Sequence, residues 1–475
     1  MAADTRPIVV IQTQRMGDLI LTYPLLLWLG RTRPGQPVTV VAEPTFAGPL
    51  SRVSPAARYL PLAQGGRLIG QDCSLVVNLS IRPEAARLAG ELAAETKCGP
   101  VTDAAGVTRV LGDWQLYRAS LVGNNRHNRF HWAELNALDV VPLPEVAATR
   151  WPEPRHGGPG RVKVGLFVGA SQPEKRPDAA FFAALARELI RRGLTPVLLG
   201  GPAEVELGAA VAHLVKAPIA NLCGRLGLGA LAVLGQELAL LVTPDTGPMH
   251  LAAWTGWRVL NLSVGPVNAW ETGPYQPGHY VLTPRLSCRG CWGCGACAAG
   301  APVCQGLFDP ARVAYVAARL ARGEDKRLLG ARLPGCRLWQ SDRDARGLYR
   351  LRPLDQPGSP EARETLGALW KGIFGWLFGA WDAAPAQNAV AGLVREQPRL
   401  ASSLGRGLAV LGAALSQGVR DGDVPDVAFM NRFAPHVRPL AGFVERVLQN
   451  GDGSRAARLR CLSLLEQVAS LGPWS

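Results

Sequence analysis

The strongest constraint on the fold is an alternation of short β-branched runs with helical patterns. The first third of the chain contains three such runs, IVVIQ (8–12), VTVVA (38–42) and CSLVVNLS (73–80). This alternation predicts βαβ units around a parallel sheet. The stretch WPEPRHGGPGRV (151–162) is rich in proline and glycine, so it predicts a linker.

The alternation begins again after the linker. DAAFFAALARELIRRG (178–193) predicts a helix, and four apolar runs predict strands: VKVGLFVGA (162–170), LTPVLLGG (194–201), LALLVTPD (238–245) and WRVLNLSV (257–264). Two α/β halves in tandem predict a cleft where the C-terminal ends of both sheets face each other.

This pattern predicts four parts of the chain. They are an N-terminal Rossmann-like domain at 1–150, a linker at 151–162, a second Rossmann-like domain at 163–324, and a helical extension of unknown role at 325–475. Beyond about residue 325 the periodicity is helix-like, with no convincing strands.

The composition limits the classes of molecule that this chain is expected to bind. Among 475 residues, Lys and Arg outnumber Asp and Glu by 51 to 37, giving a formal charge of +14 that favours phosphates or an acidic membrane surface. The basic residues are scattered, which argues against a nucleic-acid partner. With no secretion signal and no run of about 18 apolar residues, we expect a cytoplasmic protein whose membrane contact is peripheral.

VTPDTGPMHLAA (242–253) predicts a strand end followed by a helix start. Free N–H groups and the positive end of the helix dipole make such a position a seat for a diphosphate. Asp245 can bind sugar hydroxyls, Thr246 and the Gly247 backbone can bind phosphate oxygens, and His250 can donate to either group. The same residues also make an ordinary helix start.

QTQRMGDLILTYP (12–24) places Asp18 where an apolar run gives way to a helix. An acid at a helix start is stabilising, typically by about 0.5–2 kcal/mol. A cap and a catalytic base are compatible roles for this carboxylate.

Four separated blocks together resemble glycosyltransferase family 9, the heptosyltransferase family of lipopolysaccharide core assembly. The blocks are IVVIQTQRMGDLILTYPLL (8–26), VGASQPEKRPDAAFFAALARELIRRG (168–193), DTGPMHLAAWTG (245–256) and GPVNAWETGPYQPGHYVL (265–282). The resemblance covers residues 7 to about 323 and implies a GT-B fold, with acceptor bound mainly by the first domain and nucleotide-sugar by the second. It also implies inverting transfer, usually of heptose from an ADP-activated donor.

The resemblance implies roles for individual residues. Asp18 corresponds to the general base, which takes the proton of the acceptor hydroxyl as its oxygen attacks the anomeric carbon. Lys175, beside the Gly169 loop, corresponds to the lysine that stabilises the departing diphosphate. Glu204 in GGPAEVE (200–206) corresponds to an acid that contacts the nucleoside, or it only favours a helix start. Arg15 is a candidate contact for an acceptor phosphate.

A cysteine cluster lies at the end of the second half. Its members are Cys288, Cys291, Cys294, Cys297 and Cys304. This spacing can make a structural zinc or iron–sulfur site, and the alternatives are reduced thiols or adventitious disulfides. Otherwise we expect no tightly bound cofactor.

Three further patterns have simpler interpretations. GLGALA (227–232) is explained by a helix entry rather than a dinucleotide fingerprint. The acid pairs Asp342/Asp344 and Asp421/Asp423 are predicted to be surface pairs, which favours a metal-free mechanism. The apolar stripe Trp370, Phe374, Leu377, Phe378 and Trp381 indicates a packing face more than a membrane-lying face.

The leading hypothesis is an inverting glycosyltransferase, peripheral on the inner membrane, that moves a heptose or related sugar from a nucleotide-diphosphate donor to a phosphorylated, lipid-linked glycan. One alternative is an epimerase or phosphorylase of the same fold, which the blocks match less well. Another is a catalytically relaxed scaffold protein, against which the joint presence of Asp18, Lys175, Asp245 and His250 argues.

Overall fold

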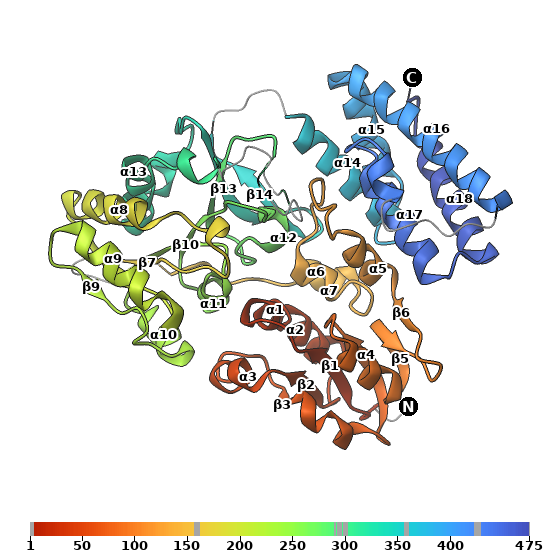
Figure 1. The fold of residues 1–475 in the computed structure, drawn as a ribbon, viewed down its shortest axis with the longest axis horizontal. Helices are drawn as coiled ribbons and strands as arrows, with labels where there is room; N and C mark the ends of the chain where they lie inside the picture. The colour runs from red at the N-terminus through yellow and green to blue at the C-terminus, as the bar shows by residue number, and fades with distance from the viewer. Residues whose placement is uncertain are drawn as a thin grey trace.

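The computed structural model describes residues 4–155, 162–288, 291, 297, 303–355, 361–421 and 429–474. It contains two sheet-based halves and a C-terminal group of helices (Figure 1). The first half lies at the lower right of the figure, the second half at the left, and the helical group at the upper right.

The first half is built on a six-stranded sheet of order β3-β2-β1-β4-β5-β6. All neighbours are parallel except β5 and β6. β1 and β2 are buried along their whole length, which is why each reads as an uninterrupted apolar run. The strands are β1 (Ile8–Gln12), β2 (Val38–Ala42), β3 (Arg58–Leu60), β4 (Asp72–Asn78), β5 (Ala93–Thr102) and β6 (Thr108–Leu111). The helices are α1 (Met16–Ile20), α2 (Tyr23–Thr32), α3 (Pro44–Leu50), α4 (Pro83–Glu91), α5 (Asp113–Ser120), α6 (Trp132–Leu135) and α7 (Leu143–Ala147).

The second half is built on an eight-stranded sheet of order β14-β13-β12-β11-β10-β7-β8-β9. The strands are β7 (Lys163–Phe167), β8 (Thr195–Leu199), β9 (Ala220–Asn221), β10 (Leu240–Pro244), β11 (Val259–Leu262), β12 (Tyr280–Pro284), β13 (Cys336–Arg343) and β14 (Tyr349–Pro353). The helices are α8 (Ala179–Arg191), α9 (Val205–Val215), α10 (Leu228–Leu234), α11 (Gly247–Trp254), α12 (Ala269–Thr272) and α13 (Pro310–Ala321). Asp178 caps α8 by accepting the N–H of Phe181, and α10 accounts for GLGALA as a helix entry.

Two strands correct the prediction that residues 325–475 are helical. β13 and β14 form an antiparallel hairpin that extends the second sheet beyond β12. β14 alternates buried residues with arginines at exposed or half-exposed positions, but β13 breaks the alternation because Leu338 and Trp339 are adjacent and both buried. Arg350 pairs with Asp342 across the hairpin at 2.7 Å. Asp344 caps the hairpin turn by accepting the N–H groups of Arg346 and Leu348. The Asp342/Asp344 pair therefore belongs to this sheet, and Asp423 lies outside the described residues.

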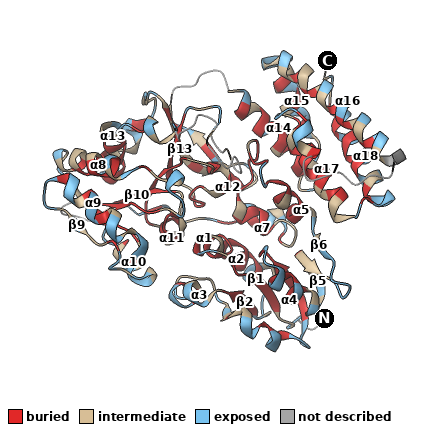
Figure 2. Ribbon diagram, viewed as in Figure 1, coloured by how far each residue is buried: buried red, intermediate tan, exposed pale blue. Residues whose placement is uncertain are grey.

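The C-terminal helices pack against α5 of the first half (Figures 1 and 2). The ring of Phe374 lies 4.5 Å from that of Tyr117, and Phe378 lies 4.9 Å from Trp114. Trp370 and Phe374 are fully buried, which confirms the packing interpretation of the aromatic stripe. These helices are α14 (Ala362–Leu377), α15 (Ala384–Glu396), α16 (Pro398–Asp421), α17 (Arg438–Asn450) and α18 (Arg455–Ala469).

In the described part of the chain, no helix combines the length and the apolar character needed to cross a bilayer.

The aromatic contact between α5 and α14 predicts that the helical group stabilises the first half. Phe374→Ala should lower the free energy of unfolding by about 3–5 kcal/mol, because a buried ring is replaced by a cavity. Val410→Ala is the matched control, since Val410 is 60% exposed and surface changes cost within about 0.5 kcal/mol. Denaturant unfolding followed by tryptophan fluorescence measures both. An unchanged stability for Phe374→Ala would contradict this packing.

Candidate active site

The two halves touch where their first-turn helices meet. A Cβ on Gly17 of α1 would lie 3.1 Å from Cδ2 of His250, and a Cβ on Gly247 of α11 would overlap the side chain of Met16. A larger side chain at Gly17 would press on the His250 ring, and one at Gly247 would force the end of Met16 to move, so the two glycines favour this close approach. The contact brings the MGD block and the DTGPMH block, which are far apart in sequence, to one place.

A cleft of about 1520 Å³ opens beside this contact. Its walls come from both halves and from the start of α14, which contributes Arg363 and Glu364. The volume exceeds the roughly 300–1,000 Å³ of common small-molecule sites. It therefore has room for more than one substrate at a time.

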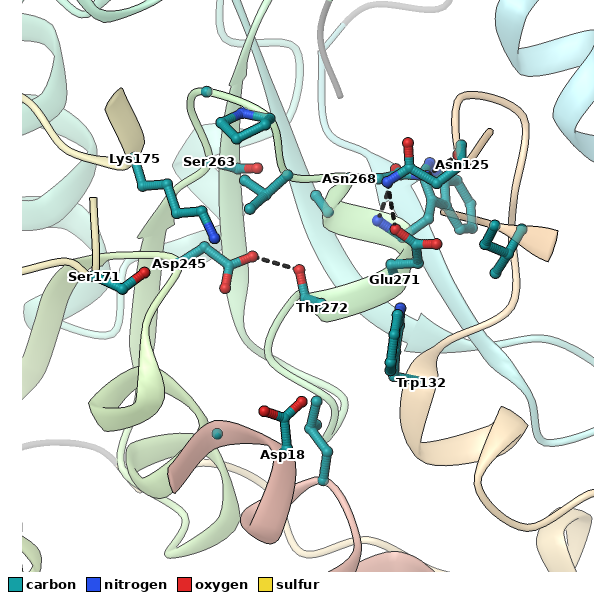
Figure 3. Close-up of a pocket in the computed structure, with 18 of the residues that line it drawn as sticks. Asp18, Asn125, Trp132, Ser171, Lys175, Asp245, Ser263, Asn268, Glu271 and Thr272 are labelled. Carbon is teal, nitrogen blue, oxygen red and sulfur yellow. Dashed lines mark hydrogen bonds between the residues drawn. The ribbon is translucent and has the colours of Figure 1, made fainter. Parts of the chain in front are cut away.

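Asp18 lines the cleft from the first half (Figure 3). It is the third residue of α1, and its Oδ2 accepts the N–H of Arg15 at 3.2 Å, so the expected cap is present. Burial raises the pKa of this carboxyl, and the charge of Arg118 together with the hydrogen bond from Arg15 opposes the increase. The carboxyl points into the cleft toward Asp245 and Thr272.

Arg118 is a cleft residue that the sequence did not reveal. It lies on α5, is 8% exposed, and donates to the carbonyl of Leu79 at 3.2 Å. Its guanidinium also lies 4.5 Å from the ring centre of Trp132. Burial lowers its pKa to about 10, so it is a cation at neutral pH and the charge that favours an ionised Asp18.

Asp245 follows β10 in the second half and is buried at the floor of the cleft. The hydroxyl of Thr272 donates to its Oδ2. Burial raises the pKa of Asp245 to about 6, while this hydrogen bond and the charge of Lys175 act in the opposite direction. Thr246 is the N-cap residue of α11, so the free N–H groups of that helix start beside Asp245.

His250 lies one turn into α11 and is 6% exposed. Its Nε2 is 4.0 Å from Oδ1 of Asp245. Burial lowers the pKa of the imidazole to about 4, so the ring is neutral at pH 7. Its Nδ1 has no hydrogen-bond partner among the described residues. A neutral imidazole in a cleft wall can donate to or accept from a sugar hydroxyl.

Lys175 reaches the cleft from the short helix η2 (Pro173–Lys175). Figure 3 shows its ammonium group directed toward Asp245. Gly265 permits this placement, because its φ is 75° and a Cβ there would lie 2.5 Å from the carbonyl oxygen of Glu174. The structure thus brings Lys175, Asp245, Thr246, Gly247 and His250 together.

Arg15 and Glu204 have different positions relative to this cluster. Arg15 is exposed and lines the cleft next to Asp18. Glu204 is not among the residues that line the cleft. Its Oε2 accepts the N–H of Gly201 at 2.8 Å, and its side chain packs against Gly169. The contact that the structure shows for Glu204 is therefore the helix-start role.

A second group that the sequence did not reveal is a buried amide–carboxyl network between the halves. Glu271 of α12 is 4% exposed and accepts hydrogen bonds from Asn125 at 2.6 Å and Asn128 at 3.1 Å. Asn268 donates to the carbonyl groups of the same two residues. Burial raises the pKa of Glu271 to about 8, so its carboxyl is largely protonated at neutral pH. Isolated asparagines give no sequence signal for such a network.

The cysteine cluster borders the cleft. Cys288, Cys291, Cys297 and Cys304 line it, and Cys294 lies outside the described residues. Within the described part of the chain, no three His, Cys, Asp or Glu side chains come together as a metal site requires. The zinc or iron–sulfur site stays a prediction.

Comparison with known proteins relates part of the chain to a family. Residues 142–293 match the family model described as glycosyltransferase family 9 (heptosyltransferase). This segment, less than half of the chain, is similar to glycosyltransferase family 9. The resemblance expected from the four sequence blocks is thereby confirmed. The cluster Lys175, Asp245, Thr246, Gly247 and His250 lies inside the matched segment, whereas Asp18 and the C-terminal helices lie outside it.

One curated relative matches part of the chain. It is lipooligosaccharide heptosyltransferase 2 of Campylobacter jejuni subsp. jejuni serotype O:2 (strain ATCC 700819 / NCTC 11168), which is 31% identical over 141 residues. The match covers 28% of this chain and 43% of the relative, so it spans less than half of the relative's length.

Solved structures show the fold. E. coli ADP-heptose lps heptosyltransferase II superposes with a TM-score of 0.51 at 19% identity, over 67% of this chain and 99% of that chain. A glycosyl transferase family 9 structure from Veillonella parvula DSM 2008 gives a TM-score of 0.47 at 22% identity, over 59% of this chain and 86% of that chain. The chain has the GT-B fold, with two Rossmann-like domains facing across a cleft.

The burial of Glu271 predicts how stability depends on pH. Its pKa is about 4.5 in the unfolded chain and about 8 in the folded protein, so ionising it destabilises the folded state as pH rises through this interval. Glu271→Gln cannot ionise, and its Tm relative to wild type should therefore rise between pH 5 and pH 9. The hydrogen-bond change on substitution is common to both pH values and cancels in this comparison.

Thermal unfolding at the two pH values measures the difference. Glu206→Gln, on an exposed position of α9, is the matched control for the general effect of removing one acid. A Tm difference between Glu271→Gln and wild type that stays constant from pH 5 to pH 9 would be inconsistent with a buried, protonated Glu271.

Proposed function

We propose that this chain is an inverting glycosyltransferase that moves a heptose, or a related sugar, from an ADP-activated donor to a hydroxyl of a phosphorylated lipopolysaccharide core or similar glycolipid. The observation that carries the proposal is the placement of Asp18, on one half, across a single cleft from Asp245, His250 and Lys175 on the other. The similarity of residues 142–293 to glycosyltransferase family 9 supports the choice of reaction.

In the proposed mechanism Asp18 is the general base. Its carboxylate takes the proton of the acceptor hydroxyl while that oxygen forms a bond to the anomeric carbon. The bond from the anomeric carbon to the diphosphate breaks on the opposite face, and its electron pair leaves with the diphosphate. One base is sufficient for this displacement, and the positive charge of Arg118 favours the ionised state that Asp18 needs.

The donor side supplies binding and charge stabilisation. Lys175 and the N–H groups at the start of α11, beside Thr246 and Gly247, face the position proposed for the diphosphate. Asp245 and the neutral His250 are proposed to bind sugar hydroxyls. For Glu204 we propose only the helix-start role that its hydrogen bond supports.

The acceptor side is basic. Arg15, Arg82 and Arg118 line the wall of the first half, and Arg15 is proposed to contact an acceptor phosphate. A formal charge of +14 favours an anionic glycolipid and the acidic surface of the inner membrane. A cytoplasmic location with peripheral membrane contact is part of this proposal.

The test is ADP release from ADP-heptose in the presence of a truncated core acceptor. Asp18→Asn should reduce turnover by about 10²–10⁴-fold, the usual contribution of a general base. ADP binding should persist, because the donor cluster lies on the other half. Asp72→Asn, whose side chain is 74% exposed, is the matched control and should retain full turnover.

Two results would overturn parts of the proposal. Unchanged turnover in Asp18→Asn would remove the general-base assignment. If wild type transferred no sugar from ADP-heptose or from a panel of other nucleotide-sugars, the transferase function itself would be wrong. Nucleotide-sugar conversion without any acceptor would indicate an epimerase instead.

A further inference from the structure

Helix α12 has only four residues, Ala269–Thr272, yet it forms part of the cleft wall. A single turn of helix is not stable by itself, because ordering its backbone costs more free energy than its first hydrogen bond provides. Its position must therefore come from the groups around it. These groups lie on both sides of the cleft.

The first half holds α12 by three hydrogen-bonding groups. The carboxyl of Glu271 accepts from Asn125 and Asn128, which are themselves buried. The amide of Asn268, the N-cap residue, donates to the backbone carbonyl groups of Asn125 at 2.8 Å and Asn128 at 3.2 Å. The carbonyl of Gly273 lies 2.8 Å from Nε2 of His131. All these partners lie within residues 125–131, so one loop of the acceptor half carries them.

The same turn of helix contacts the donor side. Thr272 is adjacent to Glu271, and its hydroxyl donates to Oδ2 of Asp245 (Figure 3). This bond orients a carboxylate that is otherwise disfavoured by burial. A continuous series of hydrogen bonds therefore runs from the 125–131 loop through Glu271 and Thr272 to Asp245.

We propose that Glu271 is a positioning residue that couples the acceptor half to the sugar-binding carboxylate: the contact of Glu271 with Asn125 and Asn128 holds α12, and α12 holds Asp245 through Thr272. The role given to Asp245 rests on the function proposed above. The coupling itself is a property of the fold and is testable without turnover.

The coupling has a consequence for the reaction. Separation of the halves removes the partners of Glu271 and Asn268, which releases α12 and then Asp245. The sugar-binding carboxylate is thus in place only when the halves are closed and water is excluded from the cleft. An activated sugar bound to the open protein is not yet aligned, which protects it from hydrolysis.

Hydrogen exchange of the full-length protein without ligand tests the coupling directly. Glu271→Ala should accelerate exchange in the peptides that cover 266–273 and 245–250, whereas Thr272→Val should accelerate mainly 245–250. Trp254→Phe is the matched control, because it keeps an aromatic ring but removes another hydrogen bond between the halves, from Trp254 Nε1 to the carbonyl of Val53 at 2.6 Å. Among the described residues this indole makes no hydrogen bond to α12. Acceleration of 266–273 alone in Glu271→Ala would overturn the coupling.

Ligand affinity separates positioning from general loosening. Calorimetry measures the affinity of each variant for ADP-heptose and for ADP. Glu271→Ala and Thr272→Val should each weaken the affinity for ADP-heptose roughly tenfold, the effect of losing one hydrogen bond to a carboxylate. The affinity for ADP should stay within about twofold of the wild-type value. The double variant should bind ADP-heptose as tightly as the single variant with the lower affinity, because both substitutions act through one series of contacts. Equal losses for ADP and ADP-heptose, or additive losses, would contradict the proposal.

Two additional variants keep the test decisive. Glu271→Gln retains the shape and hydrogen-bonding capacity, because the amide of Asn125 can turn over to match it, so it should restore near wild-type exchange and affinity. If Glu271→Ala does not fold, Asn125→Ala removes the partner instead and should give the same pattern. Failure of wild type to bind ADP-heptose would contradict the proposed donor, while the exchange experiment would still decide the coupling.

Discussion

The first turns of α1 and α11 touch because Gly17 and Gly247 present almost no side chain to each other's helix. This contact fixes the distance between the two halves at the point where the chemistry is proposed. It places Asp18 on one side and the DTGPMH block on the other, although more than two hundred residues separate them in sequence. The cleft lies beside this contact, and the hydrogen bonds around α12 join the two halves at a second place.

Close approach creates an electrostatic problem, because Asp18, Asp245 and Glu271 are acids buried beside one cleft. Burial raises the pKa values of Asp18, Asp245 and Glu271, and each is compensated differently. The buried cation Arg118 opposes the increase in the pKa of Asp18. Lys175 and the hydroxyl of Thr272 oppose the increase in the pKa of Asp245. Glu271 takes its hydrogen bonds from neutral amides, and its pKa of about 8 keeps it largely uncharged. The proposed base is thus the one with a buried cation beside it.

The sequence was sufficient for elements whose pattern is local. β1 and β2 are fully buried and read as apolar runs, and α8 carries both a cap and an amphipathic period. The DTGPMH block was recognisable because strand end, acid and helix start are contiguous. β13 and β14 were missed because β14 has only five residues and β13 breaks its alternation where Leu338 and Trp339 are both buried. Arg118 and the Glu271 network were missed because each depends on contacts between segments distant in sequence, which no local pattern records.

The C-terminal helices are part of the same structure rather than an appended module. They pack aromatic rings on α5, and α14 contributes Arg363 and Glu364 to the cleft wall. Arg129, next to the 125–128 segment that holds α12, pairs with Glu364 at 3.1 Å. The loop that contacts the second half is therefore itself supported by the helical group.

The central claim is that one carboxylate, Asp18, drives a single displacement across the cleft. The most direct measurement is the anomeric configuration of the product that wild type forms from ADP-heptose, determined by NMR. A single displacement from the face opposite the diphosphate predicts a product whose configuration is inverted relative to the donor. A product with retained configuration would contradict the account.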